Sequence, residues 1–218
     1  MTQRSVLVVL FDDLQSLDVT GPVEVFAGAD RAVGRAYEIR TASLDGAPVR
    51  TSSGLTLVPD SSLAEAAVPH TLIVPGGPST RTPDSRLLDW LRTHAPRAER
   101  LVSICSGALL LAGAGLLKGR RATTHWLPLD DLAPLGAEPT GERVVFDGKY
   151  VTAAGVSSGI DMALHLLGRI AGDEVAQTVQ LLTEYDPQPP YDAGSPEKAP
   201  AEIVAHWRGQ AEKITQSR

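Results

Sequence analysis

Short apolar runs alternate along the chain with longer segments whose apolar side chains share one face. Continuous apolar runs rich in branched residues are typical of strands that are buried on both faces. We predict such strands at 6–11, 37–41, 71–74 and 101–104. Because helical patterns separate them, the chain predicts an α/β fold with a mostly parallel sheet and helices on both faces.

The segments between and after these strands predict helices. Pro22 suits the first turn of the first helix, and Asp84 is a capping residue for a helix with Leu87, Leu88 and Leu91 on one face. Ser158 and Asp161 match a capping box. The predicted helices are one opening at Thr20-Gly21-Pro22, then 61–67, the helix after Asp84, 106–117 with Gly119 just past its end, 127–132, 158–170 and 173–185.

Turn residues predict two hairpins and a distinct C-terminal segment. A polar break at 51–54 divides 49–58 into edge strands or a small hairpin, and Asp147-Gly148 is a strong hairpin signal between 143–146 and 150–152. From Asp186 the chain is rich in proline. We expect a single domain over 1–218, in which 186–200 form a surface arm and 201–218 a terminal helix with a frayed tail.

Length, net charge and the numbers of cysteine and histidine residues exclude several classes of protein. The 218 residues suit one sizeable domain, and the formal net charge of −6 argues against a nucleic-acid surface over the whole molecule. A single cysteine excludes an intrachain disulfide, and the five scattered histidines predict no zinc site. No apolar run resembles a signal peptide or a membrane span. We expect a soluble, cytoplasmic protein that handles a small molecule, without metal, cofactor, nucleic acid or membrane.

The segment around Cys105 is the most informative for function. A predicted strand ends there and a helix follows, with small residues two before and two after the cysteine, Ser103 and Gly107. Small neighbours are what a nucleophile elbow requires, because its tight turn holds the side chain out above the sheet. A helix N-terminus would also favour the thiolate. A lone cysteine is otherwise often a small buried hydrophobe, but this context favours a reactive thiol.

Two further segments follow predicted strands and therefore point to the same edge of the sheet. Gly76 and Gly77, in Pro75-Gly-Gly-Pro78, form either an ordinary turn or, with the N–H of Ser106, part of an oxyanion hole. Asp18 either caps the first helix or faces Cys105, where a carboxyl group could bond the thiolate or carry a proton.

Two later segments have open roles. His125 could pair with Cys105 or could be packed in a pocket wall, and Trp126 could line the pocket or the core. The loop 155–159 enters a helix, so its amides could bind an anion, although helix capping alone explains it.

Taken together, these motifs resemble a known family. The segments LDVTGPVEVF, PGGP, SICSGALLLAGAGLL, ATTHW and AAGVSSGIDMAL occur in this order. They resemble the PfpI-like superfamily, which is class I glutamine amidotransferase-like and includes the Parkinson disease protein deglycase. Two branches are most similar, the isonitrile hydratases and the amidase-like ligand domain of AraC-type regulators. The tail QLLTEYDPQPPYDAGSPEKAP resembles that of isonitrile hydratases.

The resemblance implies a flavodoxin-like three-layer sandwich, usually a homodimer. It implies that Cys105 is the nucleophile, that Asp18 is the acid facing it, and that Ser106 keeps a hydroxyl where the hydratase branch usually has Thr. Gly76 and Gly77 match the turn near the oxyanion pocket. The implied activity is hydration of an isonitrile to a formamide. Alternatives are a glyoxalase- or deglycase-like enzyme for α-oxoaldehydes, a cysteine redox sensor, and a ligand-binding protein.

Overall fold

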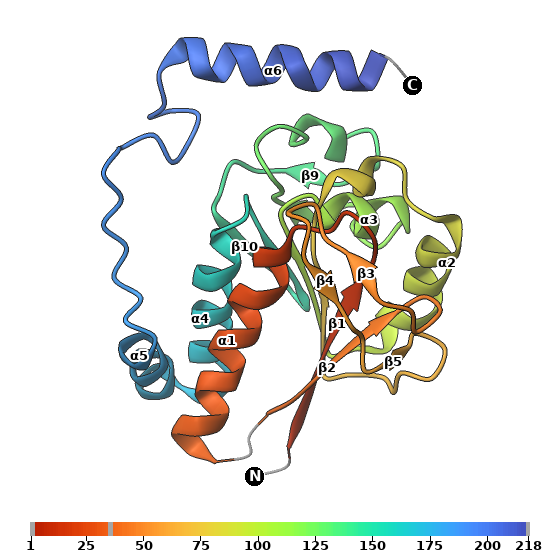
Figure 1. The fold of residues 1–218 in the computed structure, drawn as a ribbon, viewed down its shortest axis with the longest axis vertical. Coiled ribbons are helices and arrows are strands. Elements are labelled where there is room, and N and C mark those ends of the chain that lie inside the picture. The colour runs from red at the N-terminus through yellow and green to blue at the C-terminus, as the bar shows by residue number, and fades with distance from the viewer. Residues whose placement is uncertain (1–2, 35–36, 217–218) are drawn as a thin grey trace. The chain divides into compact units, whose positions relative to one another are not determined.

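A seven-stranded sheet forms the centre of the fold in the computed structural model, which describes residues 3–34 and 37–216 (Figure 1). The strand order is β10-β11-β7-β6-β1-β2-β5, and every neighbouring pair is parallel except β10 with β11. The strands of this sheet are β1 (Arg4–Leu10), β2 (Tyr37–Ser43), β5 (Ser61–Ser62), β6 (Thr71–Val74), β7 (Arg100–Ile104), β10 (Val144–Asp147) and β11 (Tyr150–Ala153).

Helices cover both faces of this sheet, as the sequence predicts. The helices of this part of the chain are α1 (Ser16–Val33), α2 (Ser85–His94), α3 (Gly107–Gly113), α4 (Ser158–Ala171) and α5 (Asp173–Leu182), with 3-10 turns η1 (Pro78–Arg81), η2 (Ala95–Arg97) and η3 (Asp130–Leu132). The architecture is therefore a three-layer flavodoxin-like α/β sandwich.

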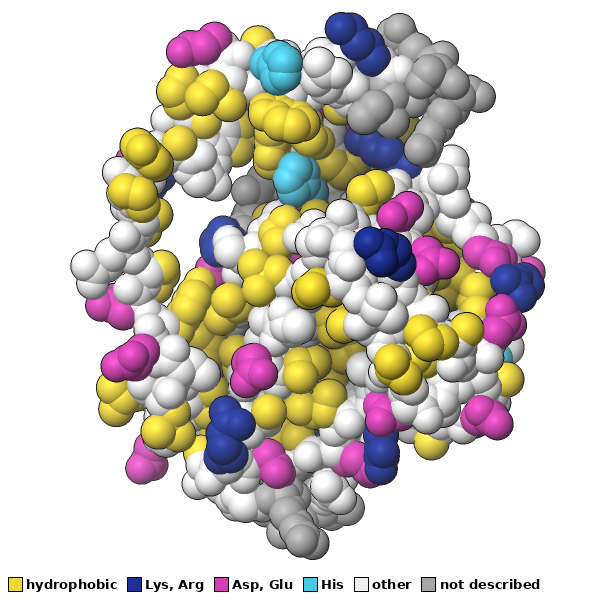
Figure 2. All heavy atoms as spheres, viewed as in Figure 1, with side chains coloured by type: hydrophobic (Ala, Val, Ile, Leu, Met, Phe, Trp, Pro, Cys, Tyr) yellow, Lys and Arg dark blue, Asp and Glu magenta, His cyan; other side chains and the backbone are white. Residues whose placement is uncertain are grey.

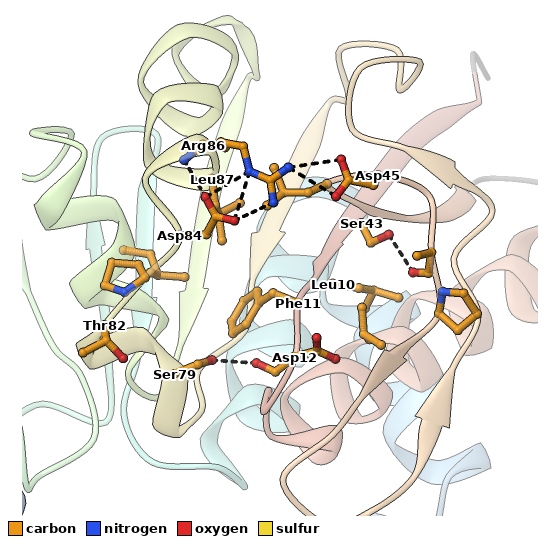
Figure 3. Close-up of a pocket in the computed structure, with 16 residues that line it drawn as sticks. Leu10, Phe11, Asp12, Ser43, Asp45, Ser79, Thr82, Asp84, Arg86 and Leu87 are labelled. Atoms are coloured by element: carbon orange, nitrogen blue, oxygen red, sulfur yellow. Dashed lines mark hydrogen bonds and ion pairs between the residues drawn. The ribbon is translucent and has the colours of Figure 1, made fainter.

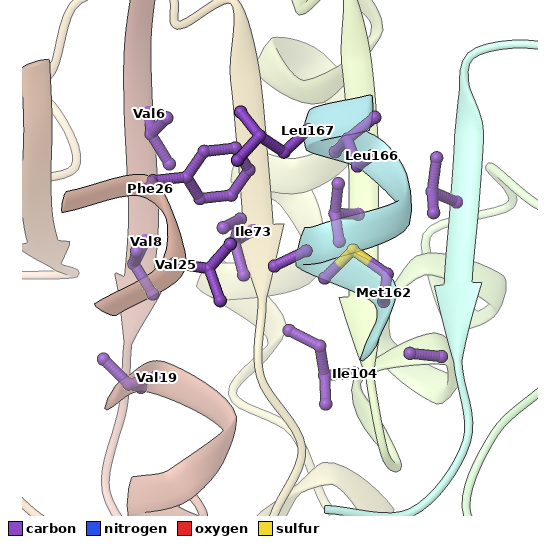
Figure 4. Packing of buried hydrophobic residues seen from close by; sticks show 14 of the residues in the cluster. Val6, Val8, Val19, Val25, Phe26, Ile73, Ile104, Met162, Leu166 and Leu167 are labelled. Carbon is purple, nitrogen blue, oxygen red and sulfur yellow. The ribbon is translucent and has the colours of Figure 1, made fainter. Parts of the chain in front are cut away.

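Two apolar clusters join the layers. In one, Phe26 of α1 and Met162 of α4 pack on the sheet residues Val8 and Ile104 (Figure 4). The other joins α2 and α3 to the opposite face of the sheet. The central strands β1, β6 and β7 are continuous apolar runs because each contributes side chains to both clusters. The strand predictions for these three strands and for β2 are confirmed.

Local signals also predict most of the small elements. β3 (Val49–Arg50) pairs antiparallel with β4 (Thr56–Leu57), and β10 pairs antiparallel with β11 around Gly148. β8 (Arg121–Ala122) and β9 (Glu138–Pro139) form a third, two-stranded sheet that the sequence pattern does not predict. The carboxylate of Asp84 accepts a hydrogen bond from the backbone N–H of Arg86, which confirms it as the cap of α2.

The prediction for the start of α1 is wrong. The helix begins at Ser16, so Pro22 lies inside it and Asp18 lies in its first turn instead of capping a later helix. The backbone N–H of Gln15 donates to the carbonyl of Gly76 at 2.8 Å, and the N–H of Asp18 donates to Gln15. The start of α1 is therefore fixed by a contact with a distant segment. Local cap and proline signals cannot predict such a contact.

The helix predicted over 61–67 does not form, and the helix predicted over 158–170 is confirmed as α4 but without its predicted capping box. Residues 61–67 form β5 and a turn, in which the Ser62 hydroxyl and backbone N–H both bond Glu65. At α4 the cap position is Ser157 without a side-chain hydrogen bond, and Asp161 pairs with Arg143 instead of completing a capping box.

Three predicted helices are shorter in the structure. α3 ends at Gly113 instead of 117, just before Gly115 takes a φ of 79°, a conformation in which glycine commonly ends helices. α5 ends at Leu182, and Glu184 takes a φ of 47°. The segment predicted as a helix over 127–132 contains the 3-10 turn η3.

The chain divides into two compact units, residues 1–184 and 185–218. In the smaller unit, Lys198 pairs with Asp192 and α6 runs over Ala201–Gln216, close to the predicted start near Ala201. Residues 217 and 218 of the predicted frayed tail lie outside the described residues. That the units form one domain stays a prediction.

The surface charge and the helices relate to the expectations about a nucleic-acid surface and a membrane span. Figure 2 shows basic and acidic side chains interspersed on the face that it presents. Across the described residues, no helix combines the length and apolarity that crossing a membrane requires.

Candidate active site

Cys105 stands at a sharp turn between β7 and α3, as the elbow motif predicts. Its φ is 54°, a strained conformation for a residue with a side chain. A Cβ at Gly107 would lie 2.2 Å from the carbonyl oxygen of Val74, so this position needs glycine. The glycine two residues after the cysteine therefore lets α3 begin directly against the end of β6.

Asp18 is fully buried near this turn. Its Oδ2 accepts a 2.8 Å hydrogen bond from the backbone N–H of Gly76, and its Oδ1 has no hydrogen-bond partner among the described residues. Burial raises the pKa of Asp18 to about 7, while the bond from Gly76 acts in the opposite direction. A carboxyl group with such a pKa exchanges its proton near neutral pH, which suits general acid–base work.

The thiol of Cys105 is more weakly acidic than the sequence suggests. Burial, and then the nearby charge of Asp18, raise the pKa of Cys105 to about 12. Hydrogen bonds from the N–H groups of Ser106 and Val156, and from the Ser106 side chain, lower it by less. The expectation that the helix N-terminus would favour the thiolate is corrected, because α3 is short and packing shields the thiol from water: Cys105 is 7% exposed.

Gly76 and Gly77 lie between Asp18 and the turn that carries Cys105 and Ser106. A Cβ at Gly76 would lie 2.5 Å from the Ser106 nitrogen and 2.9 Å from the Cys105 Cβ. The N–H of Gly77 donates to the Ser106 hydroxyl at 2.9 Å, and that hydroxyl donates to the Gly77 carbonyl at 3.2 Å. The amides of both glycines therefore hold Asp18 and Ser106.

The backbone N–H groups that face the Cys105 sulfur do not belong to the turn of Gly76 and Gly77. They belong to Ser106 and to Val156, in the loop 155–159 that the sequence marks as a possible anion site. These N–H groups, rather than those of the glycine turn, are in position to stabilise negative charge on the sulfur.

Thr124 connects the segment that carries His125 and Trp126 to the turn at Cys105. The Thr124 hydroxyl donates to the carbonyl of Cys105 at 2.7 Å, and a Cβ at Gly155 would lie 2.8 Å from the His125 ring. Sequence reasoning gives Thr124 no role, since nothing local distinguishes it from its neighbour. The ring of Trp126 lies 5.8 Å from that of His125, between centroids.

The hydrogen bonding of His125 determines what it can do. Burial, and then the charge of Arg81, lower the pKa of His125, so the ring is neutral at pH 7. Its Nδ1 accepts from the backbone N–H of Leu127 at 3.2 Å, which leaves the proton on Nε2. Among the described residues, no hydrogen bond joins His125 to Cys105. His125 is thus a ring N–H donor that stands beside Gly155.

Side chains that commonly bind metal ions do not cluster in the part of the chain that the structure describes. Within 3–34 and 37–216, no group of three or more His, Cys, Asp or Glu side chains converges on a point where an ion could sit.

The fold and the site together define a class of protein. It is a flavodoxin-like α/β protein with a cysteine on a nucleophile elbow, paired with a buried aspartate. The family model described as "DJ-1/PfpI family" matches residues 4–169. The chain belongs to the DJ-1/PfpI family.

Individual relatives make the likeness more specific. The chain is 41% identical to an isonitrile hydratase of Pseudomonas putida over 93% of this chain and 87% of that protein. It is 30% identical to the HTH-type transcriptional regulator GbdR of Pseudomonas aeruginosa, over 84% of this chain and 51% of that one. A crystal structure of a THiJ/PfpI family protein from Pseudomonas syringae is similar with a TM-score of 0.91 and 32% identity, over 99% and 89% of the two chains.

Proposed function

We propose that this protein is an isonitrile hydratase, which adds water to R–N≡C to give the formamide R–NH–CHO. The observation that carries the proposal is the buried pair of Asp18 and Cys105, held together by Gly76. The 41% identity to an isonitrile hydratase of Pseudomonas putida supports the same reaction. The terminal carbon of an isonitrile becomes electrophilic when it is protonated, so an acid and a nucleophile must meet at one atom.

In the first step, Asp18 gives its proton to the isonitrile carbon and the Cys105 sulfur attacks that carbon. The thiol proton passes to the carboxylate as the S–C bond forms. The product is a thioimidate, R–N=CH–S–Cys105, and Asp18 is protonated again. With a pKa of about 7, Asp18 is protonated in about half of the molecules at neutral pH, and the neutral thiol of Cys105 supplies the second proton.

In the second step, Asp18 protonates the imine nitrogen and then takes a proton from water as the water attacks the carbon. The tetrahedral intermediate R–NH–CH(OH)–S–Cys105 collapses when the C–S bond breaks. The hydroxyl proton passes through Asp18 to the sulfur, which releases the formamide and restores the thiol. The N–H groups of Ser106 and Val156 stabilise charge on the departing sulfur.

The remaining site residues orient the reactants. The Ser106 hydroxyl, fixed by Gly77, would orient the attacking water. His125 and Trp126 would form the wall that receives the substituent R.

The test is product formation. Purified protein is incubated with cyclohexyl isonitrile, and N-cyclohexylformamide is followed by mass spectrometry for the native chain, Cys105→Ala, and Asp89→Asn as a surface control. We expect product from the native chain and the control and none from Cys105→Ala. Full turnover by Cys105→Ala would overturn the mechanism.

The alternatives make different predictions in the same samples. A glyoxalase-like enzyme would instead form lactate from methylglyoxal without glutathione. A redox sensor would take up oxygen at Cys105 under mild peroxide. Burial and a raised pKa disfavour the sensor, because the thiolate is the form that oxidises. A ligand-binding protein would bind isonitrile without product.

The assembly and location are proposed from the family resemblance alone. We propose a homodimer that acts in the cytoplasm on a small-molecule substrate. Light scattering of the purified protein tests the dimer.

A further inference from the structure

A cavity opens on the side of the sheet that α2 and α3 cover. It encloses about 310 Å³, which lies within the range of small-molecule sites. Its lining shares no residue with the set proposed for catalysis around Cys105. Apolar side chains form the floor, among them Phe11, Leu44, Leu87 and Leu110.

Charged side chains are arranged unevenly around this floor. In Figure 3 the bridge from Arg86 to Asp45 crosses one end, Asp12 lies at the other, and Phe11 stands between them. The guanidinium of Arg86 bonds Asp45 at 3.3 Å and Asp84 at 2.7 Å, so two carboxylates offset its charge. Among the described residues lining the cavity, negative charge is in excess.

Asp12 is the carboxylate without an ion pair. Its Oδ1 accepts from the backbone N–H of Arg50 at 2.8 Å, and no ion pair to it is present among the described residues. The Arg50 side chain runs toward Gly54, where a Cβ would lie 3.7 Å from Nη2. A cation at this end of the cavity would therefore meet a carboxylate and the neighbouring ring of Phe11, which also attracts positive charge.

We propose that this cavity binds a small organic ammonium ion with an apolar body. The ammonium group would lie at Asp12 and Phe11, and the apolar body would cover Leu44, Leu87 and Leu110. An inorganic cation leaves the apolar floor exposed to water, and an anion meets the excess of carboxylates, so neither fits the lining as a whole.

The cavity is built on the same backbone as the catalytic turn. The Ser79 hydroxyl, which lines the cavity, donates to the carbonyl of Asp12 at 2.6 Å. The next carbonyl, of Asp13, lies so near Gly77 that a Cβ there would approach it to 2.2 Å. The cavity and the catalytic turn are therefore joined through the backbone of Asp12, Asp13 and Gly77.

Calorimetry with three matched probes tests the proposal: 2-phenylethylammonium, 2-phenylethanol and 3-phenylpropanoate, titrated into the full chain. Asp12→Asn removes the charge and keeps an acceptor for Arg50, and Ala47→Phe fills the cavity from its exposed rim. Asp89→Asn, at an exposed acid of α2 outside the cavity, is the control. We expect the ammonium probe to bind best, and both cavity variants to weaken it at least about fivefold while the control leaves it unchanged.

Each other outcome overturns the proposal. These outcomes are no binding of the ammonium probe, equal or tighter binding of the alcohol or the carboxylate, unchanged affinity in the cavity variants, or equal weakening by Asp89→Asn. If Ala47→Phe changes the oligomeric state in light scattering instead of the affinity, a second copy of the chain covers the cavity. The experiment requires no catalysis, so it is independent of the isonitrile assay.

Discussion

Asp18 and Cys105 are buried next to one another, and the charge of the carboxylate raises the pKa of the thiol. A third group stands between them, since the N–H of Gly76 bonds Asp18 and the backbone of Gly76 abuts Cys105. At neutral pH the thiol therefore keeps its proton, and about half of the Asp18 carboxyl groups keep theirs. In the proposed reaction these are the protons that the isonitrile carbon and nitrogen receive.

Asp18→Asn should remove a pH-dependent cost from the folded protein. The pKa of Asp18 is about 7 in the folded chain, above its ordinary value of 3.8. The folded state therefore loses stability as pH rises from about 4 to 7, because over this range the carboxyl ionises in the unfolded chain but keeps its proton in the folded one. The loss is at most about 4 kcal/mol. Urea unfolding at pH 5 and pH 8 should show this loss in the native chain and a smaller one in the variant. An equal loss in both would contradict it.

The rate of hydration should fall as pH rises through about 7, because Asp18 then loses the proton that it delivers to the isonitrile carbon. The measurement is kcat/KM for cyclohexyl isonitrile from pH 5 to 9. Carbon NMR of the Asp18 carboxyl should give the same midpoint. A rate that stays level across this range would remove Asp18 as the acid. Asp18→Asn should lower kcat by about 100-fold or more.

Gly76→Ala should destabilise the fold, because the added Cβ would lie 2.5 Å from the Ser106 nitrogen. Overpacking of this kind costs about 2 kcal/mol or more, and kcat should fall with it. Gly113→Ala is the matched control, since its Cβ would lie 3.6 Å from Leu88 at the exposed end of α3. The control should be neutral or stabilising by up to roughly 1 kcal/mol. Similar thermal unfolding of the two variants would show that the close approach is relieved at no cost.

Ser106→Ala should leave the backbone N–H of Gly77 without its partner, whereas the Gly77 carbonyl keeps its hydrogen bonds from Thr80. We expect a loss of about 1–2 kcal/mol in unfolding free energy and at least about a tenfold loss in kcat. Ser106→Thr keeps the hydroxyl and should retain both within a few-fold. If Thr behaves like Ala in denaturation and in the isonitrile assay, the hydroxyl is not the group that matters.

The sequence alone predicts the central strands, the parallel sheet and the elbow at Cys105. These features depend on near neighbours: continuous apolar runs predict β1, β6 and β7, and small residues around Cys105 predict its turn. The candidate residues Asp18, Gly76, Gly77 and Ser106 also lie together as the order of the motifs suggests. Local signals suffice because every one of these segments ends at the same edge of a parallel sheet.

Only the tertiary structure decides how those residues behave. α1 starts at Ser16 because Gln15 bonds Gly76, a segment about sixty positions away. The same packing excludes water from Asp18 and Cys105, so their pKa values rise although a helix N-terminus by itself would have favoured the thiolate. Turns and strands depend on bonds a few residues apart, whereas the energy of a charge depends on whatever distant segments displace its water.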